Sequence, residues 1–242
     1  MDINSKIIIS FIVPAHNEEA WIGCCVSAIH DAMKSVSESY EVIVVDDAST
    51  DATAIIAQQQ GAYVIHVEHR MISATRNSGA REARGDILIF VDADTLVNAP
   101  VIQSILRGIR KGAVGGGCVP RFDGKLPLSW SLLYPLLPFG AHVLHLTGGA
   151  CQFCTRDVFI VIGGFSEKHY AAEDALLCKM LKQQGRFFVP RERILTSGRS
   201  IRANSFWSIM NVLTRLLLHG PDGFRNRDEW DMWYRPKREK PQ

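Results

Sequence analysis

The sequence lacks an excess of charge of either sign. Its 27 lysines and arginines nearly balance its 25 aspartates and glutamates, which gives a formal charge of +2. Because this balance gives no general electrostatic attraction to nucleic acid, we expect no nucleic-acid partner, and any anion site must be local. No internal repeat is found, which disfavours a solenoid. The 242 residues, 47% of them hydrophobic, are otherwise typical of a globular protein that can bury a full core.

Three further absences narrow the class of protein. No GxGxxG glycine set follows the first apolar run, residues 7–13, which disfavours a dinucleotide-binding dehydrogenase. Only Cys151 and Cys154 have CxxC spacing, and without a second pair to complete a zinc site we expect reduced, buried thiols. The start of the chain has an apolar run too short for a signal peptide and no small-residue cleavage site, so an unprocessed cytoplasmic protein is expected.

Residues 126–146 carry no formal charge, but three prolines and a glycine interrupt this apolar segment. These interruptions argue against a straight transmembrane helix. We favour a buried connection or a wall of an acceptor site. A surface that lies on a membrane stays open as the alternative, because Trp130 and Tyr134 are typical of interfacial segments.

Short β-branched runs alternate with helical patterns along the first half of the chain. Strands are expected at 7–13, 41–45, 62–67, 86–91 and 113–119, and helices at 19–33, 52–60, 73–84 and 100–111. This alternation predicts an α/β fold of βαβ units around a largely parallel sheet. The second half is expected to add strands at 150–155 and 187–190 and helices at 156–162, 173–184 and 206–218.

Polar side chains follow the predicted strands, at the edge where open α/β sheets bind ligands. Asp92 and Asp94 come directly after an apolar strand, and two carboxylates so close together suit Mg²⁺ or Mn²⁺. The alternative for such a short pattern is one aspartate that caps a turn and another that is merely solvated.

Three features favour the metal site. Asp46 and Asp47 end a neighbouring strand, where a carboxylate can accept hydrogen bonds from a base or a ribose hydroxyl. Residues 173–174, Glu-Asp, open a helix and are placed like cleft residues. Arg76 lies on the third helix and could point its guanidinium at phosphate. Together these residues predict a site for a nucleoside diphosphate with a metal.

These motifs, taken in order, carry a family resemblance. They are VPAHNEE (13–19), VDDASTD (45–51), RNSG (76–79), VDAD (91–94), GGF (163–165) and ED (173–174). The series resembles the signatures of family 2 glycosyltransferases with the GT-A fold, from about residue 7 to residue 202. The resemblance implies a mostly parallel central sheet flanked by helices. It also implies transfer of a sugar from a nucleotide-diphosphate donor to an acceptor hydroxyl, with inversion at the anomeric carbon.

On this resemblance, residues 1–242 form a single GT-A domain. Residues 7–119 are its nucleotide-sugar-binding half, 120–220 its acceptor-binding half and 221–242 a C-terminal tail. The QxxRW signature and the long membrane-embedded region of processive synthases are missing, which points to an enzyme that transfers one sugar.

The resemblance also assigns roles to residues. The nucleotide pocket would be lined by Pro14, Ala15, Asn17 and Glu19, with Asp47 on the base, Arg76 near the ribose or phosphates and Asp92 on the sugar or ribose. Asp94 would carry the metal, Mn²⁺ or Mg²⁺. Asp174 matches the general base with Glu173 beside it, and Gly148 and Gly149 match the acceptor loop. The identity of the acceptor stays open between a glycan, a lipid and a small molecule.

The segment TSGRSIR (196–202) resembles a stretch found in a small bacterial subgroup of these enzymes. Arg199 and Arg202 could contact the diphosphate or an anionic acceptor, and surface salt bridges are an equally good interpretation. Many GT-A enzymes place a metal-binding histidine late in the domain, and this sequence has none at that place.

Two other functions remain as alternatives. A nucleotidyltransferase would be expected to carry a glycine-rich and basic loop after the first strand, whereas residues 14–19 are acidic. A catalytically silent module that binds a nucleotide sugar or a glycan is disfavoured by the intact Asp94 and Asp174.

Overall fold

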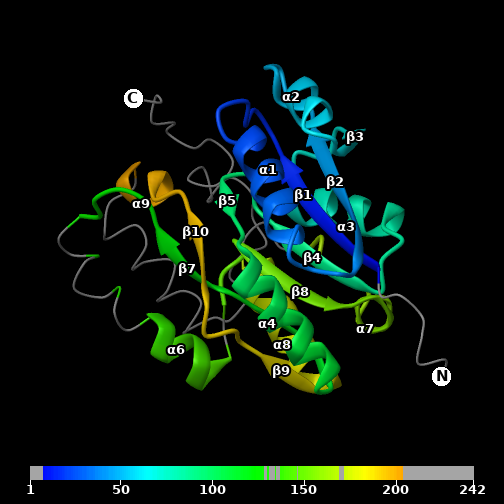
Figure 1. Cartoon of the computed structure of the whole chain (residues 1–242), viewed down its shortest axis with the longest axis vertical. Helices are drawn as coiled ribbons and strands as arrows, with labels where there is room; N and C mark the ends of the chain where they lie inside the picture. The colour runs from blue at the N-terminus through cyan, green and yellow to red at the C-terminus, as the bar shows by residue number, and fades with distance from the viewer. Residues whose placement is uncertain are drawn as a thin grey trace.

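The computed structural model describes residues 8–127, 130, 134, 137–145, 147–168 and 172–203. Its centre is a seven-stranded sheet with the order β3-β2-β1-β4-β8-β6-β9 (Figure 1). Four parallel strands make up one side of the sheet: β1 (Ile8–Ala15), β2 (Ser39–Asp47), β3 (Tyr63–Val67) and β4 (Ile87–Val91). The predicted α/β fold with a largely parallel sheet is confirmed.

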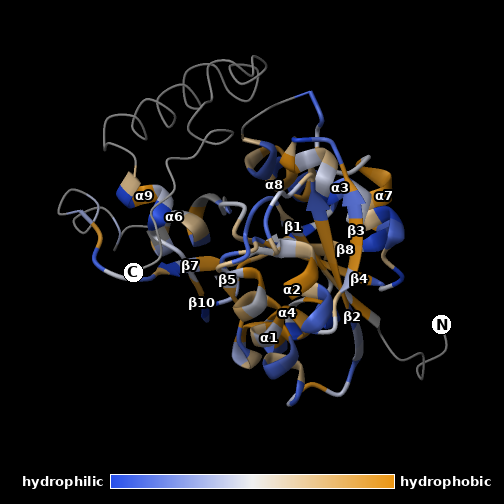
Figure 2. Cartoon of the chain, turned by 90° about the horizontal axis from the view of Figure 1, so that it is seen from above, coloured by the Kyte–Doolittle hydropathy of each residue, from blue (hydrophilic) through white to orange (hydrophobic). Residues whose placement is uncertain are grey.

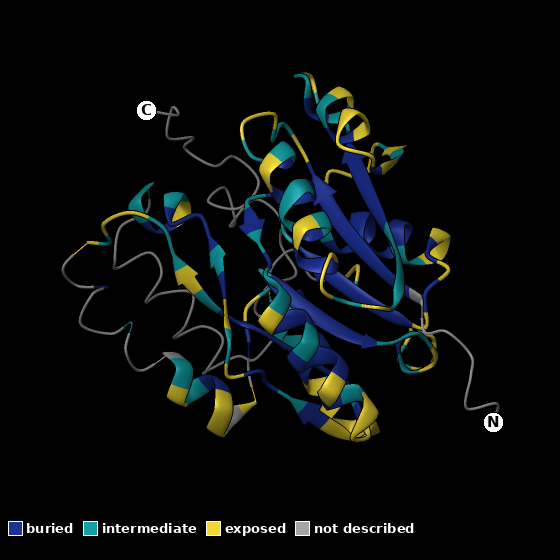
Figure 3. Ribbon diagram, in the orientation of Figure 1, coloured by how far each residue is buried: buried dark blue, intermediate teal, exposed yellow. Residues whose placement is uncertain are grey.

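Helices cover both faces of this sheet, and each face has its own hydrophobic core. One face packs against α1 (Ile22–Met33), α2 (Thr53–Gln59) and α4 (Ala99–Arg110), and the other against α3 (Ile72–Glu82), α7 (Arg156–Val161) and α8 (Glu173–Gln184). Successive residues of β1 alternate between the cores, Phe11 on the first and Ile12 on the second. Burial on both faces explains why the central strands β1 and β4 are nearly continuous apolar runs (Figures 2 and 3).

The second half of the chain completes the sheet with a change of direction. Strand β8 (Cys151–Thr155) runs antiparallel to both β4 and β6 (Ala113–Gly117), and β9 (Arg186–Phe188) is parallel to β6. The glycines of β6 allow close packing there, because a Cβ at Gly116 would lie 1.8 Å from the backbone oxygen of Phe188. Antiparallel β8 brings Gly148 and Gly149, which precede it, to the edge of the sheet where β4 ends.

A small second sheet was not predicted from the sequence. Its strands are β5 (Thr95–Leu96), β10 (Arg193–Thr196) and β7 (Val119–Phe122), in that order. The predicted strand at 113–119 is divided at Cys118 between β6 and β7, because the Cys118 N–H donates to the Cys151 carbonyl at 2.9 Å. The small sheet brings α9 (Arg199–Ala203) beside residues 92–94, since Ser197 N–H donates to the carbonyl of Asp94 at 3.2 Å.

The uncharged segment 126–146 contains a short helix, α6 (Leu137–Leu144). Trp130 and Ala141 are buried, as expected for a connection that packs against the protein, while Phe139 and Val143 are exposed. Within the described ranges, no helix combines the length and apolar character needed to cross a bilayer. The helix predicted at 206–218 and the tail at 221–242 lie outside the described residues.

Candidate active site

The loops that follow β1 and β2 bind each other at the carboxyl edge of the sheet. The Asn17 N–H donates to Ser49 Oγ at 2.9 Å, and Asn17 Oδ1 accepts from the Thr50 N–H at 2.6 Å. Glu19 Oε2 accepts from the Ala52 N–H at 3.0 Å. The side chains of Asn17 and Glu19 therefore join the two loops, while Pro14 and Ala15 end β1 as buried residues.

Backbone strain occurs in both of these loops. Asn17 and Ala48 have φ values of 52° and 56°, which L residues other than glycine rarely adopt. Such conformations persist only where the surroundings fix them, and they are concentrated at functional sites. The hydrogen bonds between the loops supply that support.

Asp47, predicted to hold the base, is a buried carboxylate at the end of β2. Its oxygens accept from the backbone N–H groups of Arg70 at 2.8 Å and Met71 at 3.2 Å and from the Thr75 hydroxyl at 2.7 Å. The carboxylate thus fixes the start of α3, and a contact between Asp47 and a base stays a prediction.

Arg76 has the most distinctive environment in the site, because its side chain is 1% exposed. Nη2 lies 2.7 Å from Asp92 Oδ1, and Nη1 lies 2.9 Å from Glu173 Oε1. Burial lowers the pKa of the guanidinium, but the two carboxylates outweigh burial and raise the pKa overall, so Arg76 stays charged. The sequence predicted a guanidinium near the ribose or phosphates, whereas the structure places it between strand β4 and helix α8, bound to protein carboxylates.

The residue after Arg76 anchors the GGF motif. Asn77 Nδ2 donates to the Phe165 carbonyl, and Asn77 Oδ1 accepts from the Phe165 N–H, both at 2.9 Å. A Cβ at Gly164 would lie 2.7 Å from Asn77 Oδ1, and the φ of +78° there also requires glycine. Phe165 in turn packs its ring 5.2 Å from the Arg76 guanidinium carbon. The RNSG and GGF motifs therefore form one unit that positions Arg76.

Glu173 and Asp174 occupy the first turn of α8, where the helix dipole favours negative charge. Burial raises the pKa of Glu173 to about 7, and burial also raises the pKa of Asp174. The predicted acceptor-loop glycines lie against this turn, since a Cβ at Gly148 would be 3.9 Å from Asp174 Oδ2. The Gly149 carbonyl accepts from Arg76 Nη2 at 3.3 Å.

Asp92 and Asp94 follow β4 as predicted, but they pair with different arginines. Asp92 binds Arg76, as described above, and Asp94 Oδ2 lies 3.0 Å from Arg199 Nε. Burial raises the pKa of Asp94 to about 7 even though the Arg199 charge lowers it. The ionised form of Asp94 is therefore costly at this place without further positive charge.

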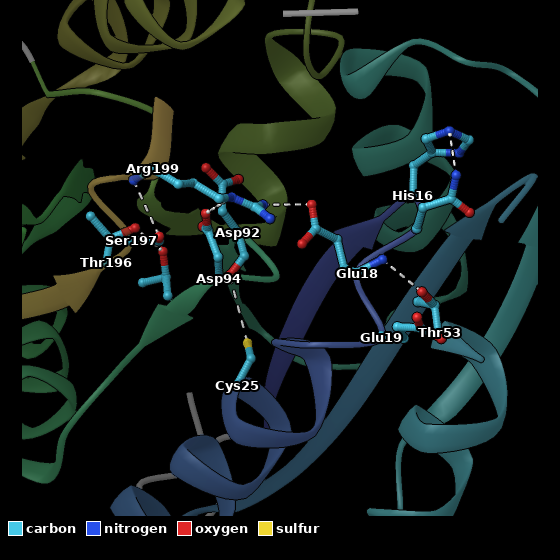
Figure 4. Close-up of polar contacts among 12 residues, drawn as sticks. His16, Glu18, Glu19, Cys25, Thr53, Asp92, Asp94, Thr196, Ser197 and Arg199 are labelled. Atoms are coloured by element: carbon cyan, nitrogen blue, oxygen red, sulfur yellow. Dashed lines mark hydrogen bonds and ion pairs between the residues drawn. The ribbon is translucent and has the colours of Figure 1, made fainter. Parts of the chain in front are cut away.

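Arg199 also contacts Glu18, with Nη2 2.6 Å from Oε1, so its guanidinium bridges two carboxylates (Figure 4). Arg202, on the same helix, pairs with Asp123 at 3.1 Å. Glu18 was not predicted as a site residue, although it lies inside the VPAHNEE motif that marked the site. In the part of the chain that the structure describes, no group of three histidines, cysteines, aspartates or glutamates has the geometry of a metal site.

Comparison with known proteins decides the family. The model of glycosyl transferase family 2 matches residues 10–164, which is more than half of the chain. The chain belongs to glycosyl transferase family 2. Membership confirms the family and the GT-A fold that the order of motifs predicted.

Several family 2 relatives and solved structures are similar to the chain. It is 31% identical over 165 residues to the dolichol-phosphate mannosyltransferase of Pyrococcus furiosus, covering 65% of the chain and 45% of that protein. It is 30% identical over 104 residues to the putative glycosyltransferase EpsH of Bacillus subtilis, covering 41% and 29%. The chain thus spans less than half the length of these relatives.

Solved structures share the fold at lower identity. The mannosyltransferase PcManGT of Pyrobaculum calidifontis, in complex with GDP-Man and Mn²⁺, matches with a TM-score of 0.66 and 19% identity, over 91% of this chain and 72% of that one. The S. aureus TarS fragment in complex with UDP matches with a TM-score of 0.62 and 20% identity, over 79% and 60%.

The buried contacts of Arg76 generate a stability prediction for this family 2 chain. Arg76→Met leaves Glu173 and Asp92 without their cation, and loss of one partner from a buried ion pair costs about 3–5 kcal/mol. Chemical denaturation should show a loss of that size in the free energy of unfolding. The matched control is Arg107→Met, whose exposed pair with Glu192 at 3.4 Å should contribute less than about 1 kcal/mol. Equal losses in the two variants would contradict the structural role of Arg76.

Proposed function

We propose that this family 2 chain is an inverting glycosyltransferase that moves one sugar from a nucleotide-diphosphate donor to an acceptor hydroxyl. The observation that supports it best is the buried Arg76, which joins Asp92 at the end of β4 to Glu173 at the start of α8. This link holds Asp92, the proposed donor contact, and Asp174, the candidate base that follows Glu173, at one edge of the sheet. Structures with the same fold contain UDP or GDP-Man, which supports a nucleotide-sugar donor here.

In this proposal the nucleotide lies against the joined loops after β1 and β2. Pro14, Ala15, Asn17 and Glu19 shape the pocket, and Asp47 is the proposed contact to the base. Asp92 is the proposed contact to the ribose or sugar. The hydrogen bonds between the loops support this assignment, because they hold the pocket in shape before the donor binds.

The donor set at Asp94 fits a divalent cation. Asp94 supplies a hard carboxylate that is costly to ionise alone, and the buried Glu18 Oε2 has no hydrogen-bond partner among the described residues. Mg²⁺ and Mn²⁺ commonly bind through one or two carboxylates together with substrate phosphates. Asp94 would hold the metal, which when bound stabilises negative charge on the leaving diphosphate.

Asp174 is the proposed general base. Its carboxylate removes the proton from the acceptor hydroxyl while the hydroxyl oxygen attacks the anomeric carbon. The new C–O bond forms on the face opposite the leaving group, and the bond between that carbon and the diphosphate oxygen breaks. The raised pKa of Asp174 makes it a stronger base than an ordinary aspartate. Gly148 and Gly149 are the proposed acceptor loop; a Cβ at Gly148 would lie 3.9 Å from Asp174 Oδ2, and one at Gly149 would lie 2.9 Å from Arg76 Nη2.

Replacing the base should separate binding from turnover. Asp174→Asn removes proton transfer but keeps the shape of the side chain, so turnover should fall by about 10²- to 10⁴-fold while donor affinity is kept. A thermal-shift screen of UDP-GlcNAc and GDP-mannose with Mn²⁺ identifies the donor, and product formation then gives the rate. Asp157→Asn, an exposed aspartate in the first turn of α7, is the control and should have wild-type turnover. Unchanged turnover in Asp174→Asn would show that Asp174 is not the base. If the wild-type protein binds the donor but shows no turnover, the result favours a catalytically silent module that only binds a nucleotide sugar.

The same assignment predicts an acid limb in the pH profile of turnover. A general base must be ionised, so turnover falls as pH decreases through the apparent pKa of the coupled Glu173 and Asp174 pair. Because burial raises both pKa values, this limb should lie above the ordinary aspartate value of about 3.9. Glu173→Gln removes a neighbouring negative charge and should move the limb to lower pH. An unmoved limb would show that the pair does not control turnover.

Metal dependence has its own test. EDTA should abolish transfer or donor hydrolysis, and Mn²⁺ or Mg²⁺ should restore it. Asp94→Asn should raise the metal concentration needed for half-maximal activity, since it removes the negative charge on the proposed ligand. Asp123→Asn, which alters a carboxylate paired with Arg202, serves as the control for metal dependence. Full activity in metal-free buffer would contradict the proposed role of the metal.

A further inference from the structure

Arg199 connects three segments that are far apart in the sequence. Glu18 lies in the turn after β1, Asp94 follows β4, and Arg199 begins α9 after the small second sheet. The guanidinium contacts Glu18 Oε1 at 2.6 Å and Asp94 Oδ2 at 3.0 Å. The three side chains are 14%, 17% and 24% exposed, so the cluster is largely shielded from water.

The cluster has too little positive charge for its carboxylates. One guanidinium contacts two carboxylates, those of Glu18 and Asp94, and Asp92, two residues before Asp94, is a third carboxylate close by. Glu18 Oε2 is buried and accepts no hydrogen bond from any described residue. Buried carboxylate oxygens are costly unless a cation or a donor satisfies them. The cluster therefore has the charge and the unused oxygen to bind a second cation.

Arg199 occupies the position that such a cation would need. Arg199 Nε lies 3.0 Å from Oδ2 of Asp94, the proposed metal ligand. A metal that binds this oxygen must therefore displace the guanidinium or share the carboxylate with it. A guanidinium and a divalent cation repel each other at that distance. A diphosphate changes this balance, because its oxygens can bind both the metal and a displaced arginine.

We propose that Arg199 competes with the divalent metal for Asp94 and Glu18, so that metal binds weakly to the protein alone and tightly once a nucleotide diphosphate draws Arg199 away. This inference rests on the proposed function, since it concerns the same metal site. It makes Arg199 a positioning residue that couples the two ligands. Because coupling between two ligands is reciprocal, the metal strengthens nucleotide binding by the same factor.

The test measures Mn²⁺ binding to the purified full chain by electron paramagnetic resonance of free Mn²⁺, first without nucleotide. Arg199→Met removes the competing charge and should tighten Mn²⁺ binding by about tenfold, within the usual range of coupling between sites. Arg202→Met is the matched control, because Arg202 lies on the same helix and pairs with Asp123 rather than Asp94. Its Mn²⁺ affinity should equal that of the wild type.

The titration is then repeated with saturating UDP or GDP. The wild type should bind Mn²⁺ more tightly with nucleotide, and the advantage of Arg199→Met should shrink or reverse. Arg199→Gln gives a second neutral variant if the methionine variant does not fold, as judged by circular dichroism. The decisive comparison is made without nucleotide. The inference is wrong if both folded Arg199 variants bind Mn²⁺ no more tightly than the wild type does.

The outcomes separate this inference from the proposed function. If Mn²⁺ activates the wild type while Arg199→Met and wild type bind Mn²⁺ equally, the competition is wrong and the metal-dependent transfer stands. If Mn²⁺ neither binds to any form nor activates turnover, both the competition and the metal role are wrong.

Discussion

The site depends on one buried charge, the guanidinium of Arg76. Its charge is buried between β4 and α8, where it needs carboxylates to balance it, and Asp92 and Glu173 supply them at 2.7 and 2.9 Å. Because these two carboxylates come from opposite halves of the chain, their shared need for Arg76 fixes α8 against the edge of the sheet. The position of Asp174, one residue after Glu173, follows from the same constraint.

A second arginine repeats this arrangement at the rim of the site. Arg76 is 1% exposed and Arg199 is 24% exposed, so the first pair of contacts is structural and the second can be exchanged at lower cost. Partial exposure screens the Arg199 contacts, and water can solvate its guanidinium when it leaves a carboxylate. The two acidic residues after β4 therefore have different partners: Asp92 pairs with the buried Arg76, and Asp94 pairs with the more exposed Arg199.

Much of this was predictable because local patterns determine it. Apolar runs of β-branched residues gave the strands of the large sheet, and the acidic motifs fell at strand ends, where parallel sheets bind ligands. The partners of Arg76 and Arg199 were not predictable, since they depend on contacts between residues 76 and 173 or 18 and 199 that no local pattern encodes. The small sheet was missed for a similar reason: Thr95 and Leu96 are too short a strand to show alternation, and only their pairing with β10 defines them.

Although the overall charge of the chain is close to zero, charge is unevenly distributed at this site. Five carboxylates, those of Glu18, Asp92, Asp94, Glu173 and Asp174, share two arginines at one edge of the sheet. Burial, together with this surplus, raises the pKa values of Asp94 and Glu173. The surplus would also repel an anionic donor, so it is unfavourable for binding a diphosphate unless positive charge arrives with it. The same surplus favours a divalent cation over a further arginine, because a metal brings two charges in a small volume and leaves coordination positions for phosphate oxygens.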